Sequence, residues 1–118
     1  MNTIARGIAI AVAGLLGASG VAAAAASSHI AVGLLGPYAL IALTHAPALL
    51  ALGILAQTRI LSLAAMVLAL GAILFCGDLA TRHFTGHGLF PWSAPAGGML
   101  LIAGWLAITL AGLLALRR

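Results

Sequence analysis

Four long apolar stretches separated by short polar segments dominate the chain. They cover residues 7–26, 37–56, 60–79 and 97–116. A helix that rises about 1.5 Å per residue needs about 20 residues to cross roughly 30 Å of hydrocarbon, and each stretch has that length. None alternates apolar and polar residues as a strand of a membrane barrel does. The pattern predicts an all-α, integral membrane bundle of four transmembrane helices that forms a single domain over residues 1–118.

The three connecting segments differ in character. Ser27–Gly36 is too apolar to lie free in water, so we expect a short interfacial segment after the first span. Gln57–Arg59 is so short that it forces the second and third spans into an antiparallel hairpin. Ala80–Ala96 is the longest link. Its large aromatic side chains fit a belt at the water interface: Phe84, Phe90 and Trp92.

The first stretch has a second interpretation. Arg6, the apolar run and the alanines of Ala22–Ala26 resemble a secretory signal with small-residue cleavage sites. The run is longer than a usual signal core. We therefore expect it to be retained as a transmembrane helix.

Composition excludes the other broad classes. Hydrophobic residues make up 64% and charged residues 5% of the 118 residues, against roughly 45–50% and roughly 25% in soluble domains. So few charges cannot cover a soluble surface, and so apolar a chain is not disordered. The single cysteine, Cys76, excludes an internal disulfide.

The net charge of +4 predicts topology rather than nucleic-acid binding. The basic side chains are five arginines at the ends of the spans, without a patch: Arg6, Arg59, Arg82, Arg117 and Arg118. With four spans, all of these except Arg82 fall on the side of the two termini. The positive-inside rule then places the N and C termini in the cytoplasm. The expected partners are membrane lipids and another membrane protein subunit or a second copy, and no nucleic acid.

Small residues at helical spacing predict how the helices pack. Ala103, Ala107 and Ala111 share one face of the last span, and Gly14 and Ala18 share a face of the first. Such faces allow close backbone approach in lipid, either within this chain or against another chain.

One tryptophan and one histidine lie inside the spans. Trp105 lies near the middle of its span, so its indole N–H needs a partner and we expect the ring to face inward. His45 lies two residues before Pro47, which frees the carbonyl of Leu43. His45 either hydrogen-bonds the backbone or a nearby hydroxyl such as that of Thr44, contacts a ligand or metal, or transfers a proton.

Asp78 is the only acidic residue of the chain, and Arg82 follows it at a spacing that brings the two together on a helix. This spacing predicts an ion pair at the end of the third span. The alternative is a gate or relay group shared with His45 and His29.

A metal centre or a catalytic site has little support. His83 and His87 are four residues apart, but Gly86 and Gly88 make a continuous helix there doubtful, and both histidines are expected in solvent. The four histidines with Cys76 and Asp78 include no CxxC, HExxH or CxxCH spacing. No paired carboxylates, phosphate loop or Ser/His/Asp arrangement is recognisable. We therefore expect no metal, no cofactor and no enzymatic activity.

Three motifs resemble those of the small YgdD-like membrane proteins. Ala72–Leu79, reading AILFCGDL, resembles their third-span motif, with Asp78 in place of a serine. Ser93–Gly98, reading SAPAGG, together with Ala103-Gly104-Trp105 resembles their Thr-Pro-x-Gly-Gly…Ala-Gly-Trp signature, in which Gly97, Gly98 and Gly104 are structural. His29 and His45 stand where the family has histidines. Family positions of Gly-Ala-Phe-Gly-Ala and Tyr-Gln are replaced here by Ala24–Ser28 and Ile41-Ala42.

The resemblance implies a four-helix protein of the bacterial inner membrane with no established activity. Together with the residues it predicts a non-enzymatic accessory or assembly subunit, or a binder of lipid or a small apolar ligand. The alternatives are an oligomeric carrier or proton relay that uses His45 and Asp78, and a metal- or haem-binding redox subunit. The candidate ligand-binding or relay residues are His29, His45, Asp78, Arg82 and Trp105, with Pro47 as a structural residue.

Overall fold

Four helices make up the described part of the chain. The computed structural model describes residues 1–29 and 33–118. Its helices are α1 (Thr3–His29), α2 (Leu35–Leu55), α3 (Arg59–Thr85) and α4 (Ser93–Ala115), and no strand occurs among these residues. Each helix is long and apolar enough to cross a membrane. The predicted all-α membrane bundle is confirmed, and the chain is a multi-pass membrane protein.

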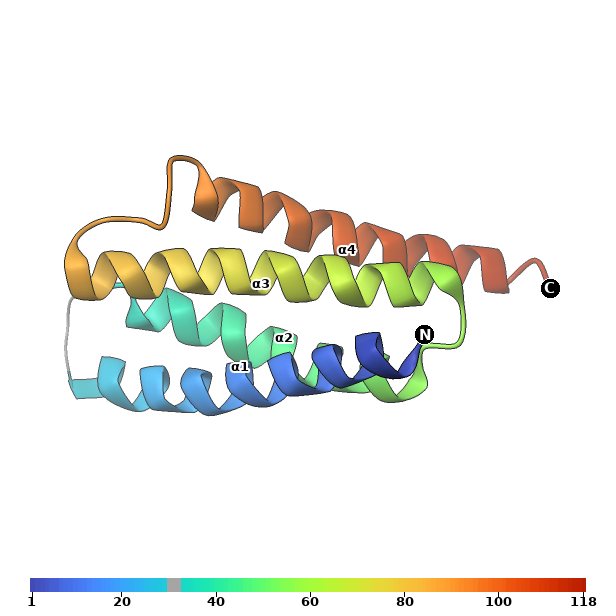
Figure 1. The fold of residues 1–118 in the computed structure, drawn as a ribbon, viewed down its shortest axis with the longest axis horizontal. Helices are drawn as coiled ribbons and strands as arrows, with labels where there is room; N and C mark the ends of the chain where they lie inside the picture. Colours follow the sequence, from blue (N-terminus) through green and yellow to red (C-terminus); the bar gives the residue numbers. More distant parts are fainter. Residues whose placement is uncertain (30–32) are drawn as a thin grey trace.

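The helices form two hairpins that lie side by side (Figure 1). α1 packs mainly against α2 and α4 against α3, while α2 and α3 join the hairpins. Both termini and the α2–α3 link lie at one end of the bundle, here called the terminal end. The end of α1 and the α3–α4 link lie at the other, the loop end. The bundle measures 50 × 26 × 25 Å, so its long axis exceeds the roughly 30 Å of membrane hydrocarbon.

The boundaries of α3 have clear local causes. The hydroxyl of Thr58, before the first turn, accepts a hydrogen bond from the Leu61 N–H at 3.2 Å, which satisfies one of the free amides of a helix start. At the other end Gly86 adopts φ 81°, and its N–H donates to the Arg82 carbonyl at 2.9 Å. A residue with a side chain rarely adopts this left-handed conformation, so glycine ends the helix here.

The predicted interfacial segment over Ser27–Gly36 is wrong at both described ends. α1 continues through Ser27 and Ser28 to His29, and α2 already begins at Leu35. The hydroxyls of the two serines donate to the carbonyls one turn earlier, at 3.0 and 2.7 Å. A serine that satisfies itself in this way stays in a helix within apolar surroundings. Residues 30–32 lie outside the described residues.

The third link is shorter than predicted because helices extend into it from both sides. α3 runs on to Thr85, six residues beyond the predicted end at Leu79, and α4 begins at Ser93. The hydroxyls of Thr81 and Thr85 donate to carbonyls one turn back, both at 2.7 Å. Pro95 fits in the first turn of α4, where its missing N–H costs no helical bond. The link is thus residues 86–92.

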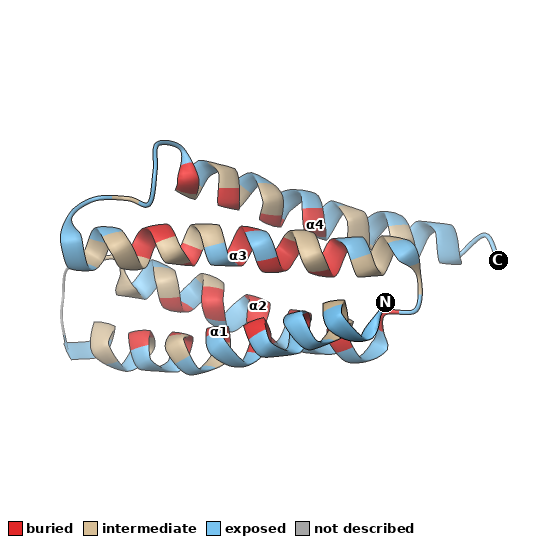
Figure 2. Ribbon diagram, viewed as in Figure 1, coloured by how far each residue is buried: buried red, intermediate tan, exposed pale blue. Residues whose placement is uncertain are grey.

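The core is built mainly from small residues of α1, α2 and α3 (Figure 2). Leu49 and Leu68 are its largest apolar side chains without exposure, and alanines surround them. Large apolar side chains instead cover the outside of the bundle. Because lipid removes the hydrophobic drive between helices, close approach of small residues holds them together.

The stripe that α4 buries differs from the predicted alanine stripe. α4 buries Gly97, Leu101 and Gly104, whereas Ala103 is exposed and Ala107 is only half-buried. A Cβ on Gly97 would lie 2.6 Å from the Phe75 backbone nitrogen, and one on Gly104 would lie 2.6 Å from a methyl carbon of Leu68. Only glycine permits an approach this close, so the glycines face α3.

Two further expectations about small residues need revision. A Cβ on Gly98 would meet the Phe75 ring only at 3.9 Å, so packing does not require glycine there. On α1, Gly14 and Ala18 are exposed, and the buried face instead includes Ala13 and Leu16. Gly14 and Ala18 therefore do not pack α1 within this chain, and the alternative contact of their face with another chain stays a prediction.

Candidate functional site

A fully buried carboxylate anchors the loop end. Asp78 is 0% exposed. Its Oδ2 accepts from Arg82 Nε at 2.8 Å, and its Oδ1 accepts from the Leu89 N–H at 3.0 Å and from the Ser93 hydroxyl. The predicted Asp78–Arg82 pair is therefore formed. The carboxylate also ties the link and the start of α4 to α3.

The link packs tightly over this carboxylate. A Cβ on Gly88 would collide with the Asp78 carboxylate and lie 2.7 Å from Arg82 Nη2. Trp92, just before α4, adopts φ 70° with an exposed ring. A positive φ is costly for a bulky residue, and it persists only where neighbouring contacts hold it. The bonds of Leu89 and Ser93 to Asp78 provide such contacts.

A histidine–tryptophan hydrogen bond joins the two hairpins. Trp105 Nε1–H of α4 donates to His45 Nε2 of α2 at 3.0 Å, and the rings meet edge to face at 5.8 Å. His45 Nδ1 lies 2.7 Å from the Ile41 carbonyl and 3.1 Å from the Thr44 hydroxyl. An indole N–H only donates, so Nε2 carries no proton and Nδ1–H donates to Ile41. Both ring nitrogens are thereby satisfied.

The structure corrects the expectation that Trp105 faces inward. Its N–H points to His45, but the side chain is 42% exposed. The reason is that the backbone of α4 lies against α3 and not against α2, so the Trp105 side chain has to reach across to His45. The helix runs unbroken through Pro47, and His45 bonds the carbonyl of Ile41 rather than the one that the proline frees.

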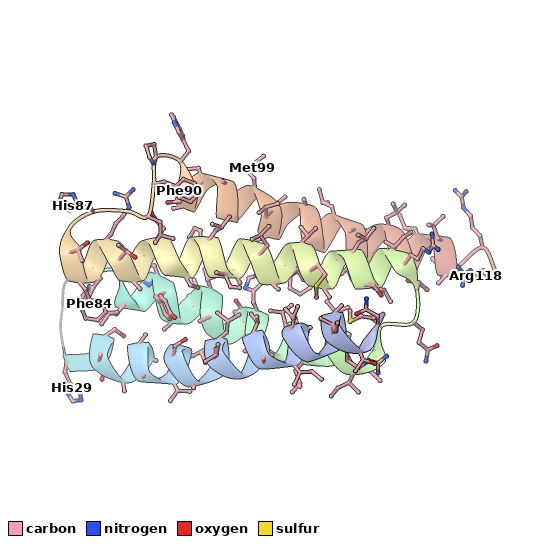
Figure 3. The ribbon with its side chains drawn as sticks, in the orientation of Figure 1. His29, Phe84, His87, Phe90, Met99 and Arg118 are labelled. Atoms are coloured by element: carbon pink, nitrogen blue, oxygen red, sulfur yellow. The ribbon has the colours of Figure 1, made fainter. Side chains whose placement is uncertain are left out.

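The remaining histidines lie apart from these clusters. His29 and His87 project away from the bundle at the loop end (Figure 3). His83 is not in solvent as expected: it is half-buried, and its Nδ1 accepts from the Leu34 N–H at 3.4 Å. Position 83 is helical because α3 extends past it, which turns its ring towards the start of α2.

No hydrogen bond among the described residues links His29, His45 and Asp78, the three side chains of the alternative relay. The hydrogen bonds of His45 and those of Asp78 have no residue in common. Across residues 1–29 and 33–118, no three His, Cys, Asp or Glu side chains gather closely enough to hold a metal ion. Cys76 is buried and unpaired in this part of the chain.

A lateral groove opens between α1 and α3, with Tyr38 of α2 at its base. It consists of two adjoining cavities of about 320 and 220 Å³ that share Ser19 and Tyr38. Small residues, including Ala22 of α1 and Gly77 of α3, line it together with large apolar ones such as Leu15 and Ile73. Exposed Phe84 lies at its outer end.

The polar atoms of the groove belong to a pair that the sequence analysis did not single out. The Tyr38 hydroxyl donates to Ser19 Oγ at 2.8 Å, and Ser19 Oγ lies 3.4 Å from the Leu16 carbonyl. The phenolic oxygen of Tyr38 keeps its capacity to accept. Ser19 stands alone as a hydroxyl within the apolar run 7–26, and an isolated polar residue in a span was the available signal.

Fold and sites together define a small multi-pass membrane protein with paired polar clusters and a lateral apolar groove. The family described as "Protein of unknown function (DUF423)" matches residues 16–98, more than half of the chain. The chain belongs to this family. The match agrees with the expectation of an uncharacterised small family that the motifs gave. No solved structure matches the chain.

Proposed function

We propose that the protein is a non-enzymatic membrane protein that binds a lipid chain in the lateral groove. The observation that supports this is the groove itself, an apolar hollow between α1 and α3 with the Ser19–Tyr38 pair at its base. Because the groove lies between helices that are long and apolar enough to span a membrane, we expect it to open to hydrocarbon rather than to water. An acyl chain is the occupant that a bilayer supplies at high concentration.

The dimensions of the groove suit a chain. Its wall on α3 runs from Ile73 to Phe84, which at about 1.5 Å per residue gives roughly 16 Å. Small side chains such as Ala22 and Gly77 leave room for the chain, and dispersion contacts with the large apolar side chains beside them replace those of bulk lipid. A chain lying here would end near Phe84, at the loop end, where an aromatic side chain suits the interface.

The polar pair gives this site a preference among lipids. Tyr38 spends its single proton on Ser19, so its oxygen is free to accept one hydrogen bond. A lipid with a hydroxyl near its chain can donate that bond. A saturated hydrocarbon segment leaves it unmade, and an unmade bond in an apolar medium costs about 1–3 kcal/mol.

The setting that we propose is the bacterial inner membrane with both termini in the cytoplasm. Arg6, Arg59, Arg117 and Arg118 belong to the terminal end, and Arg82 alone belongs to the loop end. The positive-inside rule supports this orientation. The groove then opens toward the outer leaflet.

Native mass spectrometry of protein released gently from its own membrane tests the proposal. The wild-type chain is expected to carry a lipid mass. Ala22→Leu fills the groove and should remove the lipid that is bound there, whereas Ala25→Leu, on an exposed position of α1 outside the groove, should retain it. Tyr38→Phe should lower the share of hydroxyl-bearing lipid. A wild-type chain without lipid but with a stoichiometric partner protein would overturn the proposal and favour an accessory subunit.

A further inference from the structure

A second cavity lies at the opposite end of the bundle from the groove's outer mouth. This terminal-end pocket has a volume of about 490 Å³ and lies between the start of α1 and the start of α3. Asn2, Gln57, Thr58, Arg59 and Ser62 form its polar side. Because the α2–α3 turn contributes to it, the pocket lies where the spans meet the membrane surface.

Along one face of α3 the residues that line the pocket change from polar to apolar. Arg59, Ser62 and Met66 are three or four residues apart, so their side chains share a helix face. Leu63 beside them is 65% exposed. From Arg59 to Met66 the helix rises about 10 Å. A ligand that follows this face passes from a cation and hydroxyls to bare apolar side chains.

The charge of this end is uncompensated. It holds Arg6, Arg59, Arg117 and Arg118, while the single acidic residue, Asp78, is paired with Arg82 at the loop end. Arg6 donates to the Ile54 carbonyl at 3.2 Å. Within the described residues Arg59 takes part in no ion pair, and it is one of the residues that line the pocket.

We propose that the terminal-end pocket binds the phosphate of an anionic phospholipid, with Arg59 as its principal ligand. The planar guanidinium matches phosphate oxygens in a two-point hydrogen-bonded geometry. The side-chain amide of Gln57 supplies a further donor, whereas the Ser62 hydroxyl already donates to the Thr58 carbonyl at 3.0 Å. The acyl chains then run along Leu63 and Met66 into the hydrocarbon. Basic pockets at the cytoplasmic side of transmembrane helices bind anionic headgroups in this way. The site is separate from the lateral groove and does not depend on its occupant.

The test compares lipid retention by the full-length protein in nanodiscs made from phosphatidylcholine with or without phosphatidylglycerol. After transfer to detergent, native mass spectrometry counts the anionic lipid that remains bound. Arg59→Gln is expected to lower retention about fivefold, the factor that ~1 kcal/mol per basic residue at a lipid surface gives. Arg118→Gln is the matched control, because it removes the same charge at a side chain that projects from the end of the chain away from the bundle (Figure 3). It should leave retention unchanged.

Three results decide between the explanations. Equal losses in the two variants would overturn the site, because they would mean diffuse attraction to the terminal end. Unchanged retention in Arg59→Gln would overturn it as well. Displacement of the lipid by millimolar inorganic phosphate would support the proposal, because it would show that the pocket recognises the phosphate of the lipid headgroup. Ala22→Leu, which fills the lateral groove, should leave this anionic lipid bound, so failure of one site is distinguishable from failure of the other.

Discussion

Replacing the buried carboxylate of Asp78 by an amide gives the sharpest test of how the loop end is held. Asp78→Asn keeps the shape of the side chain but leaves one acceptor oxygen in place of two. The remaining oxygen is expected to stay with the Leu89 N–H and the Ser93 hydroxyl, because Ser93 is fully buried and has no water to replace its partner. The new NH₂ group then faces the Arg82 Nε–H, donor against donor.

The cost follows from the three bonds. Arg82 is 46% exposed in the pair, so water can replace its partner and its loss costs no more than about 1 kcal/mol. The bonds from the Leu89 N–H and the Ser93 hydroxyl each change from a charged to a neutral acceptor, and each such change loses about 1 kcal/mol. Asp78→Asn should therefore destabilise the protein by ~2–3 kcal/mol. Arg82→Gln, the control at the exposed partner, should cost at most about 1 kcal/mol.

The measurement is unfolding in mixed micelles with increasing SDS, followed by circular dichroism. In a Trp105→Phe background the fluorescence of Trp92 reports on the link alone, and Asp78→Asn should shift it. The reasoning is refuted if Asp78→Asn lies within about 0.5 kcal/mol of wild type, a difference typical of surface substitutions. It is also refuted if Arg82→Gln costs as much as Asp78→Asn, because the Leu89 and Ser93 bonds would then contribute nothing.

Three further predictions follow from packing, hydrogen bonding and charge. Gly97→Ala should force α4 away from α3 and lower the free energy of unfolding by ~1–3 kcal/mol in the same assay. Gly98→Ala, whose Cβ has room, should be tolerated. Similar losses in both variants would contradict the close approach at Gly97. Trp105→Phe keeps an aromatic ring, although a smaller one, but leaves His45 Nε2 without its donor, so it should cost about 1–2 kcal/mol; unchanged unfolding would show that the bond to His45 adds nothing to stability. Alkaline phosphatase fused after Arg118 should be inactive and a fluorescent protein at the same point bright, and the reverse result would invert the topology.

Local patterns predicted the elements of this fold well. A run of about 20 apolar residues is the main requirement for crossing a membrane, so all four spans were predictable from the sequence. The Asp78–Arg82 pair was also legible, because helical spacing alone brings the two side chains together. Extensions such as that of α3 to Thr85 were missed, since back-bonding threonines do not look like a helix in sequence.

Contacts between distant segments were not predictable from spacing. The bonds of Leu89 and Ser93 to Asp78 depend on how the link folds back over α3. The choice of a glycine stripe over an alanine stripe on α4 depends on which helix lies beside it. The Ser19–Tyr38 pair joins two helices whose register the sequence does not state. In each case the missing information was the relative placement of helices, not the chemistry of the residues.

The distribution of hydrogen bonds over the two hairpins bears on how the protein enters the membrane. The pair of Ser19 and Tyr38 lies wholly within the first hairpin, and the Asp78 cluster lies wholly within the second. Each hairpin can therefore pass into lipid as it is synthesised with these polar groups already paired. His83 and His45 are the exceptions, because His83 Nδ1 accepts from the Leu34 N–H of the first hairpin and His45 Nε2 accepts from Trp105 of the last helix. The bond between Trp105 and His45 fixes the position of one hairpin relative to the other, so its formation would be the last step of membrane insertion and folding.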